Sequence, residues 1–345
     1  MTESPTHSLM YSELRESGAT VARQRTANAA GVQALAARLR ATPPVAVLTC
    51  ARGSSDHAAT YAKYLIETRF GIPVASFAPS VASVYRTPLA TRAMLALAIS
   101  QSGKSPDLLA AVERMAAGGA SSVALVNAPG SPLAALAGTE LPLHAGPERS
   151  VAATKSFVAS LAGVASLVAA WAQDAELEAA LNDLPPLLDA AAEADWQPFI
   201  AALAGARGLY TIGRGPGLSV AAEAALKLKE TCQIHAEAFS AAEVRHGPMA
   251  LVGPGFPLLV FRQNDDAADS VDSLAEDAAR RGAPIFVVGA SLTGTIRLPV
   301  PEAAHPALDP LLQAVAFYSA VEQLARARGQ NPDKPPNLRK VTETL

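Results

Sequence analysis

The sequence contains an internal repeat, and this repeat restricts the folds that the chain can adopt. A shift of 162 residues places Arg52 on Arg214 and Gln101 on Gln263. Two apolar runs match in the same register without a gap, residues 95–99 on 257–261 and residues 123–126 on 285–288. Three elements that keep one register indicate a duplication, so the predicted fold is one that occurs twice along the chain.

Each half alternates short apolar runs with longer helical patterns. The runs read as strands bounded by glycine and polar residues, and the helical patterns lie at residues 58–68, 107–117, 219–231 and 270–281. This alternation predicts βαβ units, whose right-handed crossovers place helices on both faces of a parallel sheet. The predicted fold class is therefore α/β, with two doubly wound, flavodoxin-like domains in tandem.

The expected domain boundary lies near residue 190. Additional helices are predicted at residues 13–39 and 154–173, beside the first sheet. Pro185 and Pro186 then interrupt an alanine-rich stretch that runs to Trp196, and proline pairs of this kind usually end a helix. We therefore expect a first domain at residues 1–190 and a second at residues 191–345.

Composition excludes several classes of protein. Of the 345 residues, 50% are hydrophobic and 17% are charged, which supports two apolar cores and excludes a disordered chain. The formal net charge is −3, so no basic excess exists for binding nucleic acid. The two cysteines, Cys50 and Cys232, stand outside any Cys/His cluster. Neither a disulfide framework nor a metal site is predicted.

Two segments bear on the cellular location. The N-terminus lacks the basic and apolar regions of a signal peptide. Residues 156–173 are uncharged, but serine, glycine and alanine dilute their hydrophobicity, so a buried helix is expected here and not a membrane span. We therefore expect a cytoplasmic protein with no membrane partner.

The most informative polar segment is Ser100-Gln101-Ser102-Gly-Lys-Ser105, between a predicted strand and a helix that starts at Pro106. Ligands of parallel sheets bind beyond the carboxyl ends of the strands, and a helix N-terminus favours an anion. The segment therefore predicts a phosphate site. The alternative is that Ser105 only caps the helix, which leaves the other three polar residues unexplained.

Three further turns carry weaker signals. Arg-Gly-Ser-Ser at residues 52–55, ending in Ser55, again joins a strand to a helix. Residues 213–217 only approximate a dinucleotide fingerprint because the third glycine is misplaced, so no nicotinamide cofactor is expected. Residues 148–155 precede a predicted helix, and Thr154 could be its N-cap.

Candidate acid–base residues lie in the second half. Glu223, Lys227 and Glu230 are spaced four and three apart, so they share one face of a helix. A solvated stripe is the alternative, but the alanine and leucine residues around them favour a mostly buried helix. Among the histidines, His246 beside Gly247-Pro248 is the best candidate, and its pairing with Glu230 stays open on chemistry alone.

Together these segments resemble the SIS (sugar isomerase) family over almost the whole chain. Within that family, the sequence looks most like the isomerase half of glutamine–fructose-6-phosphate amidotransferase and the SIS-type glucosamine-6-phosphate deaminases. The motifs that carry the resemblance are Arg52-Gly-Ser-Ser, Ser100-Gln-Ser-Gly, Val151-Ala-Ala-Thr-Lys155, Ala225-Leu-Lys-Leu-Lys-Glu230, the stretch from His235 to Leu251, and Asn337-Leu-Arg-Lys340.

The resemblance implies a role for each candidate. Glu230 would be the base that moves a proton between C1 and C2 of the sugar, and Lys227 would lie near the reacting oxygens. His246 would promote ring opening from the partner subunit of a homodimer with shared active sites, and Lys340 would close over the open-chain sugar. The implied sugar-phosphate contacts are Ser55, Ser100, Gln101, Ser102, Ser105, Val151, Ala152 and Thr154. No cofactor or metal is implied.

Departures from the amidotransferase pattern favour the deaminase branch. The sequence begins at Met1 directly before the first predicted helix, so no glutaminase domain is expected, and Lys104 stands where the amidotransferase usually has an acid. The leading hypothesis is an isomerising, ammonia-releasing glucosamine-6-phosphate deaminase. Two alternatives stay open: an isomerase or deaminase for another aminosugar, ketose or fructosamine phosphate, and a non-catalytic sugar-phosphate sensor.

Overall fold

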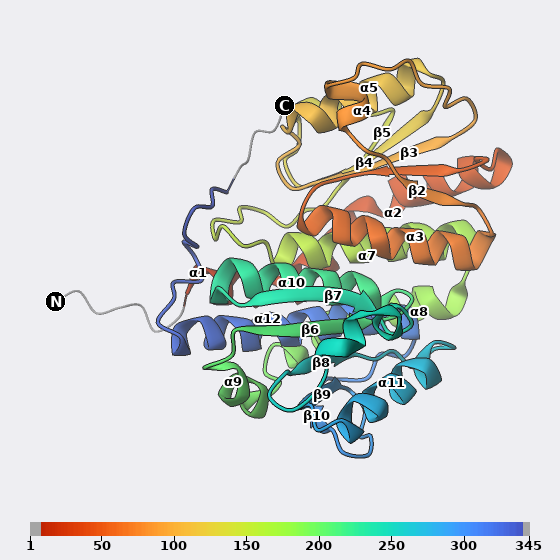
Figure 1. Ribbon diagram of the computed structural model, residues 1–345. Coiled ribbons are helices and arrows are strands. Elements are labelled where there is room, and N and C mark those ends of the chain that lie inside the picture. Colours follow the sequence, from red (N-terminus) through yellow and green to blue (C-terminus); the bar gives the residue numbers. More distant parts are fainter. Residues whose placement is uncertain (1–7, 341–345) are drawn as a thin grey trace. The chain divides into compact units, whose positions relative to one another are not determined.

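The computed structural model describes residues 8–340, which contain two parallel sheets and their helices (Figure 1). The chain divides into two compact units. One consists of the described residues up to Gly18 together with Glu148–Lys155 and Asp183–Lys340, and the other of Ala19–Pro147 and Ser156–Asn182. The units interleave along the chain, and the division into residues 1–190 and 191–345 stays a prediction.

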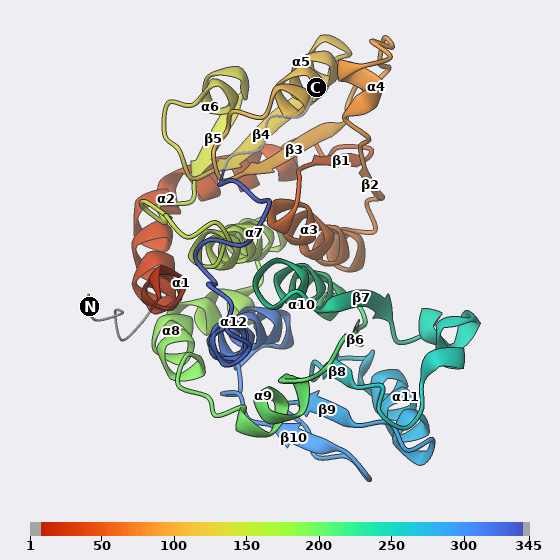
Figure 2. The ribbon, with the colours of Figure 1, turned by 60° about the vertical axis from the view of Figure 1, so that its left-hand side comes forward.

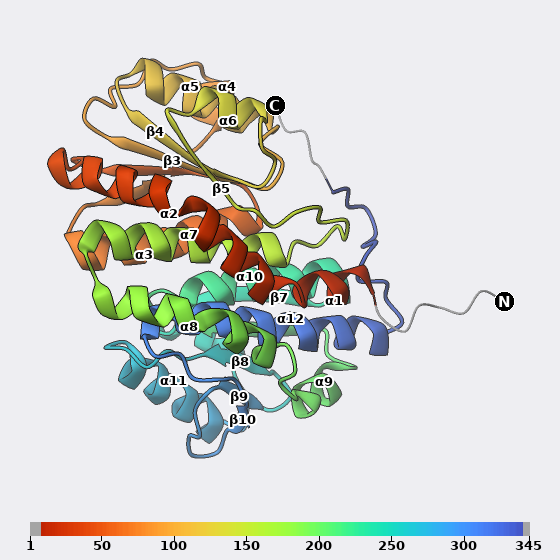
Figure 3. The ribbon, with the colours of Figure 1, turned by 180° about the vertical axis from the view of Figure 1, so that it is seen from behind.

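The first sheet has five parallel strands in the order β2-β1-β3-β4-β5. The strands are β1 (Val47–Cys50), β2 (Val74–Ser76), β3 (Leu95–Ser100), β4 (Ser121–Val126) and β5 (Thr139–Pro142). Its helices are α2 (Ser17–Ala41), α3 (Ser54–Phe70), α4 (Ser80–Ser83), α5 (Pro106–Ala117), α6 (Pro132–Leu136) and α7 (Lys155–Ala172). Helices α4, α5 and α6 cover one face, and α2, α3 and α7 cover the other (Figure 3).

The second sheet has the order β10-β9-β8-β6-β7. Its strands are β6 (Gly208–Gly213), β7 (His235–Ser240), β8 (Leu258–Phe261), β9 (Ile285–Val288) and β10 (Ile296–Leu298). Helices α10 (Gly217–Cys232) and α12 (Asp309–Ala327) cover one face, and α11 (Ala268–Arg280) packs against the other. The remaining elements are α1 (Leu9–Leu14), α8 (Ala175–Ala191), α9 (Gln197–Leu203) and the 3-10 helices η1 (Glu243–His246), η2 (Pro248–Leu251) and η3 (Pro306–Leu308).

The two sheets confirm the predicted tandem α/β fold. Counted within each half, both have the strand order 2-1-3-4-5 and only parallel pairs, which is the flavodoxin-like arrangement. Strand register repeats as well: Leu48 pairs with Ala96 in the first sheet, and Tyr210 pairs with Leu258 in the second. Both residues of the second pair lie 162 positions after those of the first, so the shift found in the sequence also relates the backbone pairing.

Two local expectations were wrong. The helix expected at residues 13–39 is found as α2 only from Ser17 onward, and residues 13 and 14 belong to the separate short helix α1, which ends at Leu14. Pro185 and Pro186 do not end a helix but lie inside α8. The apolar stripe that buries Leu177, Leu181, Leu184 and Leu188 runs through both prolines, and its packing offsets their helix-breaking effect.

Helix α7 is long and apolar enough to cross a membrane by length and composition. Its hydrophobic window is nevertheless 94% buried within the fold, as expected for a core helix. Leu125 of β4 approaches this helix at Gly163, where a Cβ would lie 3.2 Å from the leucine side chain. The predicted buried helix at this position is confirmed.

Candidate active site

The loop after β3 lies where parallel α/β sheets bind ligands, since the strand order of the first sheet reverses between β1 and β3. Gly103 N donates to Ser100 Oγ at 3.0 Å, and Lys104 N donates to Ser102 Oγ at 3.3 Å. Because each hydroxyl accepts from the loop, its own proton stays available as a donor to an anion. Gln101 is half-buried beside them.

Ser105 does not act as a helix cap, which corrects the simpler interpretation of this residue. It occupies the N-cap position of α5 with Pro106 next in sequence, yet its side chain makes no capping hydrogen bond. Asp107 instead accepts a hydrogen bond from Leu108 N at 2.8 Å. The Ser105 hydroxyl is thus not consumed by capping.

The loop after β1 contributes a charged pair that the sequence analysis missed. Ser55 lies in the first turn of α3, which begins four residues earlier than expected. Arg52, just before this helix, donates from Nε (3.0 Å) and Nη2 (2.7 Å) to one oxygen of buried Asp107. The motif Arg52-Gly-Ser-Ser gave no signal for this contact, because the partner lies 55 residues away.

The corresponding position in the second sheet is filled by protein. Gln263, the counterpart of Gln101, is 2% exposed, and its Nε2 donates to Gln313 at 3.1 Å. It packs so closely on Gly217 that a Cβ there would lie 2.1 Å from its side-chain oxygen. The loop at residues 213–217 therefore serves helix packing, and the polar loops of the first sheet are the better ligand-site candidates.

Helix α10 carries a buried charge cluster in the second sheet's unit. Lys227 is 1% exposed, and its Nζ lies 2.6 Å from Glu230 Oε2 and 3.3 Å from Glu223 Oε1. Burial alone would lower the pKa of Lys227, but the two carboxylates outweigh it and raise the pKa above its usual value. The lysine is therefore charged, and the solvated-stripe alternative for this face is excluded.

Tyr318 of α12 completes this cluster. Its hydroxyl donates to Glu223 Oε1 at 2.9 Å within the buried interior. Burial and the charge of Glu223 raise the pKa of Tyr318 well above 10, and the charges of Glu148 and Glu230 add to the shift. The carboxylates of Glu148, Glu223 and Glu230 therefore all lie close enough to Tyr318 to affect its pKa. Of the Glu230 side chain, 19% stays exposed, so a ligand can approach its carboxylate.

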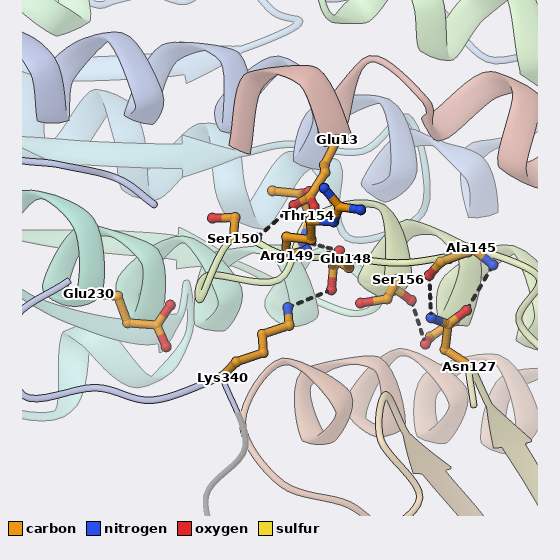
Figure 4. A network of polar contacts seen from close by, with 12 residues as sticks. Glu13, Asn127, Ala145, Glu148, Arg149, Ser150, Thr154, Ser156, Glu230 and Lys340 are labelled. Atoms are coloured by element: carbon orange, nitrogen blue, oxygen red, sulfur yellow. Dashed lines mark hydrogen bonds and ion pairs between the residues drawn. The ribbon is translucent and has the colours of Figure 1, made fainter. Parts of the chain in front are cut away.

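The segment Glu148–Lys155 is held by two carboxylates (Figure 4). Glu13 of α1 accepts from the backbone N–H groups of Arg149 and of Ser150, and Glu148 accepts from Thr154 N at 3.0 Å. Glu13 is desolvated by burial, which raises its pKa. The role of Glu13 left no trace in the sequence pattern, because its partners lie more than 130 residues away.

Three of the expected substrate contacts lie in this segment. Val151 N donates to Asp333 O at 3.2 Å, Ala152 is buried, and Thr154 N is bound by Glu148 as described. The hydroxyls of Ser150 and Thr154 are buried without a hydrogen-bond partner in the described part of the chain. Thr154 therefore does not cap α7, and its hydroxyl can serve a bound ligand.

Lys340, the last described residue, reaches into the same network. Its Nζ lies 3.1 Å from Glu148 Oε2, whose side chain is fully buried (Figure 4). Upstream, the Asp333 carboxylate accepts from the N–H groups of Leu9 and Met10 at 2.8 Å each. The part of the C-terminal segment from Asp333 to Lys340 is thus held by specific contacts at both of its ends.

His246 and Glu230 are not brought together within one chain. Helix α10 leads into strand β7 (Figure 2). Glu230 lies near the end of α10, before the start of β7, whereas His246 lies in η1, after the other end of that strand. Six strand residues span about 17 Å at about 3.3 Å per residue. His246 is exposed, so a ligand or another chain has access to it.

Residues 8–340 contain no group of three or more His, Cys, Asp or Glu side chains that could hold a metal ion. Burial raises the pKa of Cys50 to about 12 and that of Cys232 to about 11. Neither thiol is therefore a nucleophile at neutral pH.

Comparison with known families gives one match, and it covers most of the chain. The SIS domain model matches residues 46–170 and again residues 202–325. The chain is 36% identical over 324 residues to the isomerizing glutamine–fructose-6-phosphate aminotransferase of Symbiobacterium thermophilum. That alignment covers 88% of this chain and 52% of the relative, so the chain spans about half the length of the relatives it matches.

Solved structures share the fold. A protein from Silicibacter pomeroyi, provisionally described as a phosphosugar isomerase, superimposes with a TM-score of 0.91 at 46% identity and covers 94% of this chain and 100% of its own. A glucosamine-6-phosphate deaminase from Thermotoga maritima has a TM-score of 0.77 at 21% identity, covering 98% and 100%, which shows similarity of fold alone.

Proposed function

Because the chain belongs to the SIS domain family, we propose that it is a phosphosugar isomerase that acts on an aminosugar and releases ammonia. The proposed substrate is glucosamine 6-phosphate and the product is fructose 6-phosphate. The aminotransferase relative supports this substrate class, and the polar groups described above support the reaction.

One observation carries the proposal, namely that Glu230 is held by an ion pair and is still partly exposed. A base that moves a proton between adjacent carbons has to be anionic, fixed in position and accessible to the substrate. Buried Lys227 holds Glu230 at 2.6 Å and stabilises its charge, while 19% of the Glu230 side chain stays exposed. A purely structural ion pair would not need this exposed carboxylate at the end of a buried charge cluster.

The proposed reaction starts from the open-chain sugar. Glu230 removes the proton from C2 and returns it to C1, and one proton of the amine passes to O1. The aldehyde thereby becomes an alcohol and the C2–N bond becomes an imine. Water adds to C2, the C–N bond breaks, and ammonia leaves as the C2 carbonyl of fructose 6-phosphate forms. Lys227 and Lys340 stabilise negative charge on the oxygens during proton transfer. This chemistry uses a base and fixed charges, without a metal or organic cofactor.

The phosphate group anchors the substrate in this proposal. The hydroxyls of Ser55, Ser100, Ser102 and Ser105, with Gln101, donate to it, and Val151, Ala152 and Thr154 line the sugar. Such an anchor lets remote binding energy orient a flexible open-chain molecule. The proposal requires both sets of residues to act on the same substrate, with His246 opening the sugar ring from the second subunit of a homodimer.

The test is a direct assay of the purified chain. Glucosamine 6-phosphate is expected to give ammonia and fructose 6-phosphate in equal amounts, and added glutamine is expected to change neither. Turnover of a different aminosugar, ketose or fructosamine phosphate would support an isomerase or deaminase but would show that the proposed substrate is wrong. Thermal stabilisation by sugar phosphates with no turnover of any of them would favour a non-catalytic sugar-phosphate sensor over an enzyme.

A further inference from the structure

The ion pair between Arg52 and Asp107 joins the loop after β1 to the first turn of α5, at the place where the strand order of the first sheet reverses. Both Nε and Nη2 of Arg52 donate to Asp107 Oδ2, while Asp107 Oδ1 accepts from Leu108 N. The carboxylate is 2% exposed, but the Arg52 side chain is 50% exposed. A buried anchor thus fixes a guanidinium that faces solvent beside the polar loop.

This geometry leaves part of the guanidinium for a ligand. The contacts to Asp107 use Nε and Nη2, so Nη1 is not needed for the pair. Arginine binds carboxylate and phosphate through several planar donors, and a charged donor binds an anion more strongly than a hydroxyl does. Pinning by Asp107 also reduces the side-chain entropy that such a contact would otherwise cost.

The duplicated half provides an internal comparison. Arg214 occupies the position 162 residues later, but it forms no ion pair among residues 8–340. Asp269, the counterpart of Asp107, is exposed on α11, and Gln263 fills the space at the loop. The anchored arginine therefore occurs beside the partly exposed Gln101 and is missing where its counterpart Gln263 is buried.

We propose that Arg52, positioned by Asp107, is a specificity residue that contacts the phosphate group of the substrate in addition to the serine hydroxyls. This inference rests on the proposed function and adds to the same site a cationic contact that selects phosphorylated over unphosphorylated sugars. Arg52 acts on binding and leaves the proton-transfer step to other residues.

The experiment compares wild type with Arg52→Gln, Arg52→Lys and the matched control Arg214→Gln. Calorimetry measures binding of fructose 6-phosphate and of inorganic phosphate at low and high salt, and kinetics separate KM from kcat. We expect Arg52→Gln to weaken both ligands by roughly 10- to 100-fold, to reduce the salt dependence and to raise KM more than it lowers kcat. Arg52→Lys should recover part of the affinity, and Arg214→Gln should behave like wild type.

Three results would overturn the inference. Unchanged phosphate affinity in Arg52→Gln would show that Arg52 does not contact the phosphate group. Loss of affinity that parallels loss of thermal stability, with no recovery in Arg52→Lys, would make the pair purely structural. Failure of the wild type to bind either ligand would refute both this inference and the proposed function. If the wild type binds fructose 6-phosphate but does not release ammonia from glucosamine 6-phosphate, the reaction is wrong and the binding comparison still decides the role of Arg52.

Discussion

Lys227 is the residue whose environment is hardest to explain without a function. Two carboxylates hold its ammonium in a fully buried position, with Glu223 also bound by Tyr318. Replacing a buried ion pair with apolar residues of similar volume is often neutral or stabilising, so stability alone does not account for this cluster. Its one partly exposed member, Glu230, is the group that a substrate can reach.

For this reason Glu230→Gln separates binding from chemistry. The amide keeps the shape but cannot accept a proton from carbon, so turnover is expected to fall by roughly 100- to 10,000-fold while sugar-phosphate affinity changes little. Initial rates of ammonia release and calorimetric affinities measure the two effects. Lys229→Gln, an exposed neighbour on the same helix, is the control and should be nearly neutral. A wild-type rate in Glu230→Gln would exclude this residue as the base.

Asp309 predicts a pH dependence of stability. It is 8% exposed at the start of α12, and burial raises its pKa to about 6. Since this pKa lies above the ordinary value, the folded state binds the proton more tightly, and the contribution of Asp309 to stability is lost as pH rises through about 6.

Asp309→Asn should therefore unfold less readily than wild type above that pH, by about 2–3 kcal/mol, and the difference should vanish below about pH 4. Denaturant unfolding at several pH values measures this, with exposed Asp266→Asn as the control. A difference that did not vary with pH would contradict the assignment.

At the scale of elements, the β3–α5 loop depends on Gly103. Its φ is +63°, and a Cβ would lie 2.2 Å from Ser131 Oγ and 2.9 Å from Val126 Cγ2. Gly103→Ala is expected to destabilise the fold by about 2–4 kcal/mol and to raise KM for the sugar phosphate, because strain and crowding both deform the loop.

Gly130→Ala is the matched control for this substitution. It has a similar φ of +68° but nothing within 4 Å, so it reports the backbone strain without the crowding. Equal effects of the two substitutions on stability and KM would show that packing against Ser131 does not shape the loop.

The elements themselves were largely predictable, because periodicity and the repeat are local or regular properties. The expected strands and the crossover helices were found, and so was the buried face of α10. Pro185 and Pro186 misled because tertiary packing of the α8 leucine stripe outweighed local proline preference. The N-cap position of Ser105 was right, but its hydrogen bonding could not be predicted from type and position.

The candidate site was less predictable than the fold, because its partners are distant in sequence. Nothing in the local pattern of Glu13 indicates that it binds the backbone at Arg149 and Ser150. The same holds for the pairs Arg52–Asp107 and Lys340–Glu148. Residue types that suit a chemistry can be recognised in a sequence, whereas the contacts that fix their orientation depend on the folded backbone.

At the scale of the whole molecule, duplication produced two equal sheets with unequal loops. In the first sheet Gln101 and Ser102 at the reversal of strand order are partly exposed, and in the second sheet Gln263, the counterpart of Gln101, is buried. The second half instead carries its charge cluster at the opposite end of α10, next to the start of β7. In the proposed function, the first copy therefore binds the anion and the second carries the base for proton transfer.

The position of His246 leads to a prediction about assembly. If the histidine beyond one end of β7 serves the substrate at the other end, it has to come from a second chain, so the enzyme is a homodimer with shared sites. Glu230→Gln and His246→Ala are each expected to be nearly inactive. Mixing the two variants under conditions that exchange subunits should restore activity, because each mixed dimer then contains one site with both native residues. Random exchange of equal amounts predicts a recovery of about one quarter of the wild-type rate.

A mixture of Glu230→Gln with Lys227→Met is the control. Both changes lie on α10 of the same chain, so no recovery is expected if His246 is the one residue that reaches the site of the other subunit. Recovery in that control would mean that mixed dimers regain activity for a reason other than a shared His246. No recovery in the first mixture despite proven exchange would place His246 outside the catalytic site.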